Sequence, residues 1–384
     1  MNDTKEKAVL DSAAATAEEQ LLSSNDNSII TKSHYGDNIN QVVSSSCQSA
    51  LETFTVSELL DMSFKPKIPV VDGIINPGTY IFAGAPKVGK SFLMLQFAYH
   101  IAKGIPLWNY PVRQGSVLYL ALEDDYSRLQ QRVARMFGEE GNENLHLATK
   151  SKTIKDGLIE EMTNFAQKYL DARLIIIDTL KRVREYDDAP ISYASDYDIM
   201  KPLKDFSDQT GISIIIVHHT RKMAADDICE TISGTNGLFG AVDGALILHK
   251  SKRTDTEAIL NVIGRDQQEL ELTLEMESET CIWNKVKSET ELFPVKPDPI
   301  LVEISQFITI ENPCWEGTAS ELIEDIPNIQ YLIKPNTLVR KLNIHRSVLY
   351  KDFGILYEPL QRSSERKIFR LSLTFDDSSN SSYD

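Results

Sequence analysis

The sequence predicts an α/β protein, in which a large domain with a mostly parallel central sheet and helices on both faces precedes a small helical module. Between Thr55 and about Val286, short apolar runs rich in β-branched residues alternate with amphipathic stretches. Alternation of this kind is typical of parallel sheets. Beyond a proline-rich stretch, the pattern changes to closely spaced helical segments. The length of 384 residues suits one large domain and a smaller companion.

Six apolar runs are predicted to be buried strands, because each is short and bounded by turn residues. They are Thr79–Ala83, Ser116–Leu122, Leu174–Ile177, Ser213–Val217, Gly244–Leu248 and Ala258–Val262. The predicted helices between them are Ser91–Ala102, Ser127–Phe137, Lys155–Tyr169 and Ser195–Thr210. Ligands of such sheets bind at the carboxyl ends of the strands, so the residues that follow the runs are the candidates for a site.

Composition divides the chain into five segments. Residues 1–54 are rich in Ser, Asn, Asp and Ala and are predicted to be a flexible tail, with a short partner-binding helix around Ala13–Leu22 as the alternative. Residues 55–290 form the sheet domain, and residues 291–299, with three prolines, form a linker. Residues 300–375 are predicted to fold as three or so helices and a small hairpin, the outline of a winged helix. Residues 376–384 form a second tail.

Charge and cysteine usage limit the classes of function. A formal net charge of −16 argues against a protein that coats nucleic acid by bulk attraction, so any DNA contact must be local. The four cysteines are widely separated without a CxxC pair, which favours the cytoplasm over a disulfide framework and predicts no zinc site. No stretch of about 18 apolar residues is present, so no membrane span is expected.

The strongest motif is GAPKVGKS, which fits G-x-x-x-x-G-K-[ST] between an apolar strand and a helix. Such a loop wraps phosphates with backbone N–H groups, while its lysine reaches the β- and γ-phosphates and its hydroxyl contacts Mg²⁺. ATP and Mg²⁺ are therefore the predicted ligands, and a chance glycine turn is disfavoured by the context. The predicted binding residues are Gly84, Ala85, Pro86, Lys87, Val88, Gly89, Lys90 and Ser91.

Two further carboxylates are candidates for the chemistry. Asp178 ends the run Leu174–Ile177 and is predicted to hold the metal, with a helix N-cap as the alternative. Glu123 follows the neighbouring run and is predicted to be the base that orients the attacking water. The alternative for Glu123 is that the acids at 123–125 only begin the next helix, where they suit its dipole.

A pair of histidines ends a third apolar run. His218 and His219 precede Thr220, Arg221 and Lys222. A polar group at this place can touch the γ-phosphate and report its presence to the following loop, and His219 is the preferred sensor. An isolated strand-end histidine with a structural role is the alternative.

The segments GAPKVGKS, LYLALEDD, LIIIDTL, IIIVHHTRK, SGTNGLFGAVDGALIL and GRD, in this order, resemble the RepA-type branch of the RecA/DnaB superfamily of hexameric helicases in plasmid and phage replication. The resemblance covers about Glu58 to Leu274 and implies a RecA-like P-loop ATPase fold. It implies a homo-oligomeric ring, expected to be a hexamer, with ATP between neighbouring subunits and with primase or other replication proteins as partners. It also implies the same roles for Lys90, Ser91 and the two carboxylates, with His219 as sensor.

The resemblance further implies an arginine supplied by the adjacent subunit to stabilise charge on the γ-phosphate. Arg265 in the GRD segment is the candidate, and Arg253 and Lys252 are weaker alternatives. The alternative is that Arg265 is a surface arginine that pairs with Asp266 and has no catalytic role.

The segment Met223–Gly240 corresponds in that family to the loop facing the central channel. Here it carries Asp226, Asp227 and Glu230 and no lysine or arginine. Its grip on a DNA backbone cannot come from side-chain charge, although backbone N–H groups around Ser233 to Gly240 remain available. This departure bears on strand translocation rather than on ATP binding.

The C-terminal module is the better candidate for DNA contact, because residues 331–372 hold nine basic and three acidic residues. A helix near Arg346–Phe353 is predicted to enter a major groove, and residues 362–370 to form a wing on the backbone. A solvated or protein-binding face is the alternative. The DNA-binding candidates are Arg340, Lys341, Arg346, Lys351, Arg366 and Lys367.

These observations predict an ATP-hydrolysing DNA helicase or motor acting in replication of a mobile element or phage. Two alternatives remain. One is a DNA-binding regulatory ATPase or loader that recruits replication proteins without unwinding, which the acidic channel segment favours. The other is a nucleotide-gated binding module with little turnover, in which Glu123 is structural.

Overall fold

The computed structural model describes residues 51–184, 193–220, 236–252, 255–265, 267–290, 297–360 and 367–374. By its internal contacts the chain divides into two units between Thr53 and Phe54, and every element below belongs to the second unit. Most of the predicted N-terminal tail, with the alternative helix around Ala13–Leu22, lies outside the described residues, as do the acidic channel residues and the C-terminal tail. The first element is a short helix, α2 (Val56–Asp61), closed by a capping box between Thr55 and Glu58.

Within the described residues, the main sheet has nine strands in the order β3-β2-β4-β5-β1-β6-β7-β8-β9. Neighbours from β3 to β6 are parallel, whereas β7, β8 and β9 continue the sheet as an antiparallel extension. The strands are β1 (Thr79–Gly84), β2 (Val117–Ala121), β3 (Leu145–Ala148), β4 (Leu174–Asp178), β5 (Ser213–His219), β6 (Gly244–His249), β7 (Glu257–Gly264), β8 (Leu270–Met276) and β9 (Trp283–Ser288).

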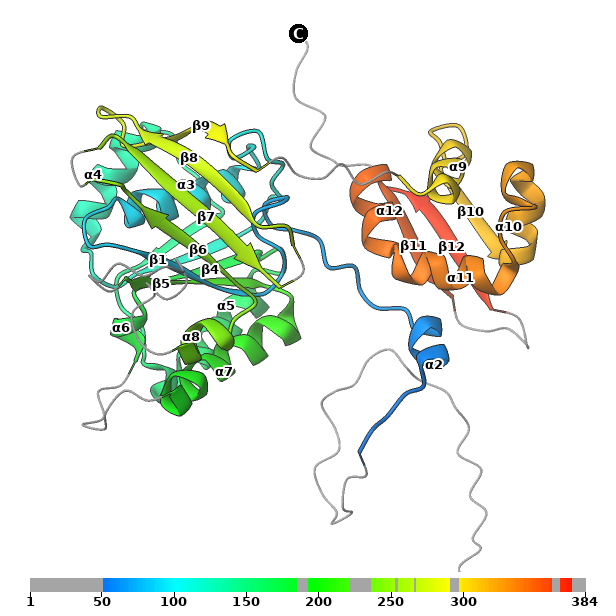
Figure 1. Cartoon of the computed structure of the whole chain (residues 1–384), viewed down its shortest axis with the longest axis horizontal. Helices are drawn as coiled ribbons and strands as arrows, with labels where there is room; N and C mark the ends of the chain where they lie inside the picture. Colours follow the sequence, from blue (N-terminus) through cyan, green and yellow to red (C-terminus); the bar gives the residue numbers. More distant parts are fainter. Residues whose placement is uncertain are drawn as a thin grey trace, which may run out of the picture. The chain divides into compact units, whose positions relative to one another are not determined.

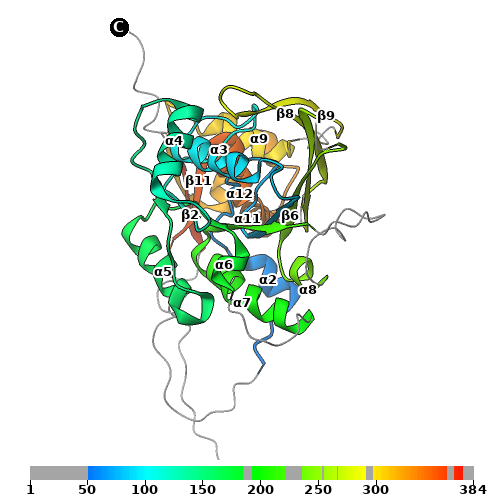
Figure 2. The same ribbon diagram turned by 90° about the vertical axis from the view of Figure 1, so that its left-hand side faces the viewer.

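Helices cover both faces of this sheet, as predicted (Figures 1 and 2). One apolar core lies beneath α3 (Lys90–Lys103) and α4 (Tyr126–Phe137). A second core lies on the opposite face, beneath four helices. These are α5 (Ile159–Lys168), α6 (Leu180–Val183), α7 (Tyr193–Thr210) and α8 (Asn236–Gly240). No helix in the described part of the chain is long and apolar enough to cross a bilayer.

All six predicted strands form, and three more strands complete the sheet. β3 is a four-residue edge strand, and polar residues interrupt β8 and β9, so neither of them forms a continuous apolar run. The predicted helix Lys155–Tyr169 starts instead as the π-helical turn η1 (Ile154–Leu158), since Gly157 adopts φ +118°. Apolar runs are thus a sufficient signal for the buried parallel strands, but not for strands at the edge.

The C-terminal module has its own apolar core, formed from its helices and a three-stranded sheet in the order β10-β12-β11. The predicted helices are present, and β11 and β12 form the predicted hairpin. The first helix begins at Pro299, inside the predicted linker, because Asp298 caps it. The elements are α9 (Pro299–Phe307), β10 (Cys314–Thr318), α10 (Ala319–Asp325), η3 (Pro327–Ile329), α11 (Pro335–Ile344), α12 (Arg346–Phe353), β11 (Ile355–Pro359) and β12 (Ile368–Leu373).

Candidate ATP site

The phosphate-binding loop follows β1 at the centre of the parallel sheet. Gly84 ends the strand, Ala85, Pro86 and Lys87 are exposed, and Val88 is buried as an anchor. Gly89 caps α3 with φ +106°, a conformation that favours glycine. The loop therefore presents backbone groups to solvent at the positive end of a long helix, as a phosphate site requires.

A tryptophan from the far end of the sheet supports this loop. Trp283 on β9 is fully buried, and a Cβ atom on Gly89 would lie 2.8 Å from Cζ2 of its ring. Gln96 on α3 exchanges two hydrogen bonds with the Trp283 backbone, at 2.8 and 2.9 Å. The antiparallel extension is thereby fastened to the P-loop and to its helix.

Lys90 is folded back onto its own loop. Its side-chain Nζ donates to the carbonyls of Gly84 at 2.8 Å and Ala85 at 2.9 Å. Burial lowers the pKa of Lys90 to about 8, although Asp178 and Glu123 act in the opposite direction. The two loop carbonyls thus hold the Lys90 ammonium group against the P-loop.

Asp178 ends β4 beside the first turn of α3. Ser91 Oγ donates to Asp178 Oδ2 at 2.8 Å, and the carboxylate is only 5% exposed. Burial raises the pKa of Asp178, while hydrogen bonds from Ser91 and Tyr119 lower it. The N-cap alternative for Asp178 does not fit, because Thr179 occupies the cap position of α6.

The hydroxyl of Ser91 and the carboxylate of Asp178 are oxygen ligands of the kind that Mg²⁺ prefers. Their contact places both at the mouth of the P-loop, where a metal bound to phosphates would lie. These residues therefore fit a Mg²⁺ ion that accompanies a nucleotide.

The three acids after β2 have separate roles. Asp125 caps α4 by accepting from the Arg128 backbone, and Asp124 pairs with Arg132 at 2.7 Å. Glu123 is exposed and instead accepts a hydrogen bond from Thr179 Oγ1, the residue after Asp178, at 3.2 Å. Of the three, Glu123 is the carboxylate directed toward the metal site, where a base for the attacking water belongs.

His219 lies next to the P-loop because β5 pairs with β1 in a register that sets Gly84 opposite His219. Its Nδ1 lies 3.2 Å from Nζ of Lys90. Burial lowers the pKa of His219, and the positive charge of Lys90 lowers it further, so the neutral imidazole accepts from the lysine. The structure thus brings His219 to Lys90, as its predicted role as a sensor requires.

Arg265 lies at the opposite edge of the sheet. It follows β7, where Gly264 pairs with Gly244 at the amino-terminal end of β6, whereas the P-loop is at the carboxyl ends. Its Nη2 donates to the Gly240 carbonyl at 2.9 Å. Arg265 is therefore remote from the nucleotide site of its own chain, and its predicted partner Asp266 lies outside the described residues.

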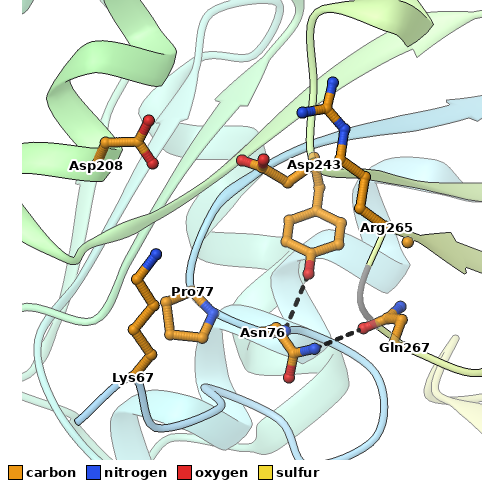
Figure 3. Close-up of a pocket in the computed structure, with 9 residues that line it drawn as sticks. Lys67, Asn76, Pro77, Asp208, Asp243, Arg265 and Gln267 are labelled. Carbon is orange, nitrogen blue, oxygen red and sulfur yellow. Dashed lines mark hydrogen bonds between the residues drawn. The ribbon is translucent and has the colours of Figure 1, made fainter. Parts of the chain in front are cut away.

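A pocket of about 270 Å³ opens beside Arg265 (Figure 3). Figure 3 shows Lys67 and Asp208 on one side of the pocket and Arg265 on the other. Its lining mixes both signs of charge and contains none of the predicted ATP-binding residues. The full lining is Lys67, Asn76, Pro77, Tyr80, Asp208, Asp243, Gly264, Arg265 and Gln267.

The weaker alternatives to Arg265 follow β6. The backbone of Lys252 donates to Asp255 Oδ2 at 2.7 Å, in the short loop that leads to β7. Arg253 is outside the described residues.

Four of the six DNA-binding candidates lie on α11 and α12, and three of the six contact residues 61–64, which precede β1. Arg340 Nε donates to Asp61 at 2.7 Å, and Arg346 donates to the Phe64 carbonyl at 3.0 Å. Lys367 lies 4.0 Å from the same aspartate. Two lysines pair elsewhere, and Arg366 is outside the described residues. These pairs are Lys351 with Asp72 and Lys341 with Asp298.

The sequence interpretation missed three residues that contact the site. Thr179 and Tyr119 bind its two carboxylates, and Trp283 supports its loop. Tyr119 carried a signal: it is a hydroxyl-bearing residue within an apolar run, two residues before Ala121, which pairs with Asp178. Trp283 carried none, because nothing local links it to a loop almost 200 positions earlier.

The arrangement fits one ATPase architecture. Glu123 and Asp178 belong to adjacent strands, and β5 separates β4 from the P-loop strand. In the sequence, residues 46–225 match the model of an AAA domain. The domain has the fold of a RecA-like P-loop ATPase, with a mostly parallel central sheet. The predicted fold class is thus confirmed.

Two curated relatives of this RecA-like chain are DNA repair proteins named RadA. The protein from Halalkalibacterium halodurans is 28% identical over 207 residues, covering 53% of this chain and 40% of the relative. The protein from Haemophilus influenzae is 24% identical over 308 residues, covering 76% of this chain and 57% of the relative. The chain thus spans about half the length of the relatives it matches. Among solved structures, a DnaB-like replicative helicase has a TM-score of 0.47 and 12% identity, covering 55% of this chain and 58% of that chain.

Proposed function

We propose that this chain is the ATP-hydrolysing subunit of a RepA-type DNA helicase that acts in replication of a mobile element or phage. The observation that carries the proposal is the convergence of Lys90, Ser91, Asp178, Glu123 and His219 at the carboxyl ends of neighbouring parallel strands, with Arg265 at the other end of the sheet. The RadA relatives are named as DNA repair proteins, which supports action on DNA.

Each side chain has a distinct role in hydrolysis. Lys90 leaves the carbonyls of Gly84 and Ala85 and donates to the phosphates, which frees Nδ1 of His219 to respond to the γ-phosphate. Glu123 accepts the proton of the attacking water. Ser91 and Asp178 hold Mg²⁺, which when bound neutralises charge on the β- and γ-phosphates.

An arginine from a second subunit completes the site in this proposal. Arg265 cannot reach the P-loop of its own chain, so its use in catalysis requires the ATP site of a neighbouring copy. A closed ring, proposed to be a hexamer, gives every ATP site such a neighbour. Hydrolysis then depends on assembly.

We also propose that residues 300–375 are a winged-helix DNA-binding module, joined through the linker 291–299 to the ATPase domain at 55–290. The consecutive helices α11 and α12, followed by the β11–β12 hairpin, support this assignment. The basic residues of α11 and α12 supply a local positive surface on an acidic chain. Primase or other replication proteins are the proposed partners of the assembled ring.

The test is the ATPase rate with and without single-stranded DNA, with Lys90→Ala as the blank. A rate that DNA stimulates and that the blank lacks is expected. Unwinding of a forked duplex then tests the helicase itself. A rate that is indifferent to single strands, together with duplex binding, would exclude a translocating helicase.

A loader that binds DNA without unwinding it is the second candidate function. Two observations favour it: the channel segment is acidic, and Arg340 and Arg346 are engaged by residues 61–64 of the same chain. Three results would identify such a loader: the chain binds duplex DNA, its ATPase rate is the same with and without single-stranded DNA, and it leaves a forked duplex intact.

A further inference from the structure

Tyr119 lies in the middle of β2 and is completely buried. Its hydroxyl donates to Asp178 Oδ2 at 2.9 Å, the oxygen that also accepts from Ser91 Oγ at 2.8 Å. Two hydroxyl groups from different elements therefore meet on a single oxygen of the metal carboxylate. None of the hydrolytic roles described above uses Tyr119.

The strand register fixes this contact. β2 pairs with β4 so that Tyr119 lies opposite Ile176 and Ala121 opposite Asp178. Tyr119 lies in the core beneath α3, so its phenol reaches the carboxylate from β2 whereas Ser91 reaches it from α3. A residue held by two paired strands has little freedom to move, so its hydroxyl is a fixed reference for the orientation of Asp178.

The electrostatic surroundings keep Tyr119 a donor. Burial raises its pKa well above the usual value, and the adjacent Asp178 raises it further. The phenol therefore donates to Asp178 in its neutral form.

We propose that Tyr119 is a positioning residue for the metal site, whose hydroxyl holds the Asp178 carboxylate in the orientation needed to bind Mg²⁺ together with Ser91. This inference rests on the Mg²⁺–ATP site proposed above. Residues that orient metal ligands commonly change metal affinity 10- to 100-fold when replaced.

The test compares Tyr119→Phe with the wild type by titrating a fluorescent ADP analogue, once with Mg²⁺ and once with excess EDTA. Mg²⁺ increases the affinity for the ADP analogue, and in Tyr119→Phe this increase is expected to be about tenfold smaller than in the wild type. The affinity measured in EDTA is expected to be the same in both proteins. The matched control is Tyr357→Phe, which removes another buried tyrosine hydroxyl, bonded to Asn343 in the C-terminal module. This control should behave as the wild type in both titrations.

The possible outcomes separate the inference from the function on which it rests. If the wild type gains affinity with Mg²⁺ and Tyr119→Phe gains as much, the inference is wrong and the metal site stands. If the wild type gains nothing, both fail. Adding Tyr119→Phe to Asp178→Asn provides a second measurement: no additional effect is expected, and a further loss of the same size would show that Tyr119 does not act through Asp178.

Discussion

At the scale of single residues, the charged and polar groups of the site are paired with one another. Lys90 donates to two loop carbonyls and lies against the ring of His219, while Asp178 accepts two hydroxyl groups. Nucleotide binding must exchange these internal partners for phosphate and metal. The affinity for nucleotide is therefore a difference between two well-paired arrangements.

The pKa of Lys90 makes nucleotide affinity depend on pH. Phosphates favour the charged form of Lys90. Above the Lys90 pKa of about 8, where the free protein has lost this proton, nucleotide binding must therefore take up a proton. The affinity for ADP should stay constant below that pH and fall above it, by at most about tenfold per pH unit. Measuring the dissociation constant between about pH 7 and pH 9 tests this expectation.

The control for the pH effect is Lys90→Arg, because a guanidinium stays charged throughout this range. Its affinity for ADP should be independent of pH, whatever its absolute value. An equal fall in the arginine variant would assign the effect to another group.

Replacing Glu123 with Gln should separate binding from hydrolysis. The amide cannot accept a proton, so phosphate release should fall by about 100-fold or more, while ATP binding measured by fluorescence stays within about twofold of the wild type. Glu139→Gln, at an exposed position just after α4, makes the same change of charge and should hydrolyse normally. Full activity in the Glu123 variant would leave the nucleotide-gated binding module as the better function.

The residues of the site were predictable to the extent that each follows an apolar run. Lys90, Glu123, Asp178 and His219 all follow such runs, and the fold brings the ends of these runs together. Tyr119 was missed because a tyrosine inside a strand is normally packing, and only the register of β2 on β4 reveals its contact.

At the scale of elements, the junction of β1 and α3 depends on a glycine in two ways. Gly89 has φ +106°, and any side chain there would collide with Trp283. Gly89→Ala should therefore lower the free energy of unfolding by at least about 1 kcal/mol more than backbone strain alone would, and should abolish ADP binding. Chemical denaturation measures the first effect and titration the second.

Gly211→Ala is the control for backbone strain. Gly211 also has a positive φ, +74°, but no atom lies within 4 Å of a Cβ atom built there. Its cost should be about 1 kcal/mol. Equal losses in the two variants would mean that the ring of Trp283 yields to a methyl group.

The predictability of the elements follows from burial. Parallel strands covered on both faces are continuous apolar runs, so β1, β2, β4, β5 and β6 were all predicted, and the parallel strand that was missed is the short edge strand β3. Polar residues interrupt β8 and β9, and β10 has no fully buried residue, so these strands resemble loops in the sequence. Their places in the sheets are set by contacts between distant segments, which local patterns do not contain.

At the scale of the whole molecule, the placement of Arg265 leads to a mixing experiment. Arg265→Ala and Lys90→Ala should each be inactive alone, because one lacks the trans arginine and the other lacks phosphate binding. Co-assembled chains should recover activity, since an intact P-loop can then face an intact Arg265. Failure to recover, with assembly verified by light scattering, would remove Arg265 from the catalytic site.

The contact between α2 and the C-terminal module predicts competition with DNA. Asp61 and the Phe64 carbonyl engage Arg340 and Arg346, which DNA phosphates would otherwise contact. Asp61→Asn should raise affinity for duplex DNA several-fold and steepen its dependence on salt. Glu311→Gln removes one negative charge elsewhere on the module and should have a smaller effect. Equal increases in DNA affinity in the two variants would mean that Asp61 acts only as one more negative charge that repels DNA.

The antiparallel extension, β7 to β9, connects the phosphate-binding loop to the turn that carries Arg265. At one end, β9 presses Trp283 under the phosphate-binding loop. At the other end, the turn after β7 carries Arg265. In a ring of such chains, each subunit would join the loop that detects its own phosphates to the arginine that it offers to the next subunit, through three hydrogen-bonded strands. Nucleotide binding in one subunit would then be coupled to the ATP site of the next through the backbone of the sheet, independently of DNA.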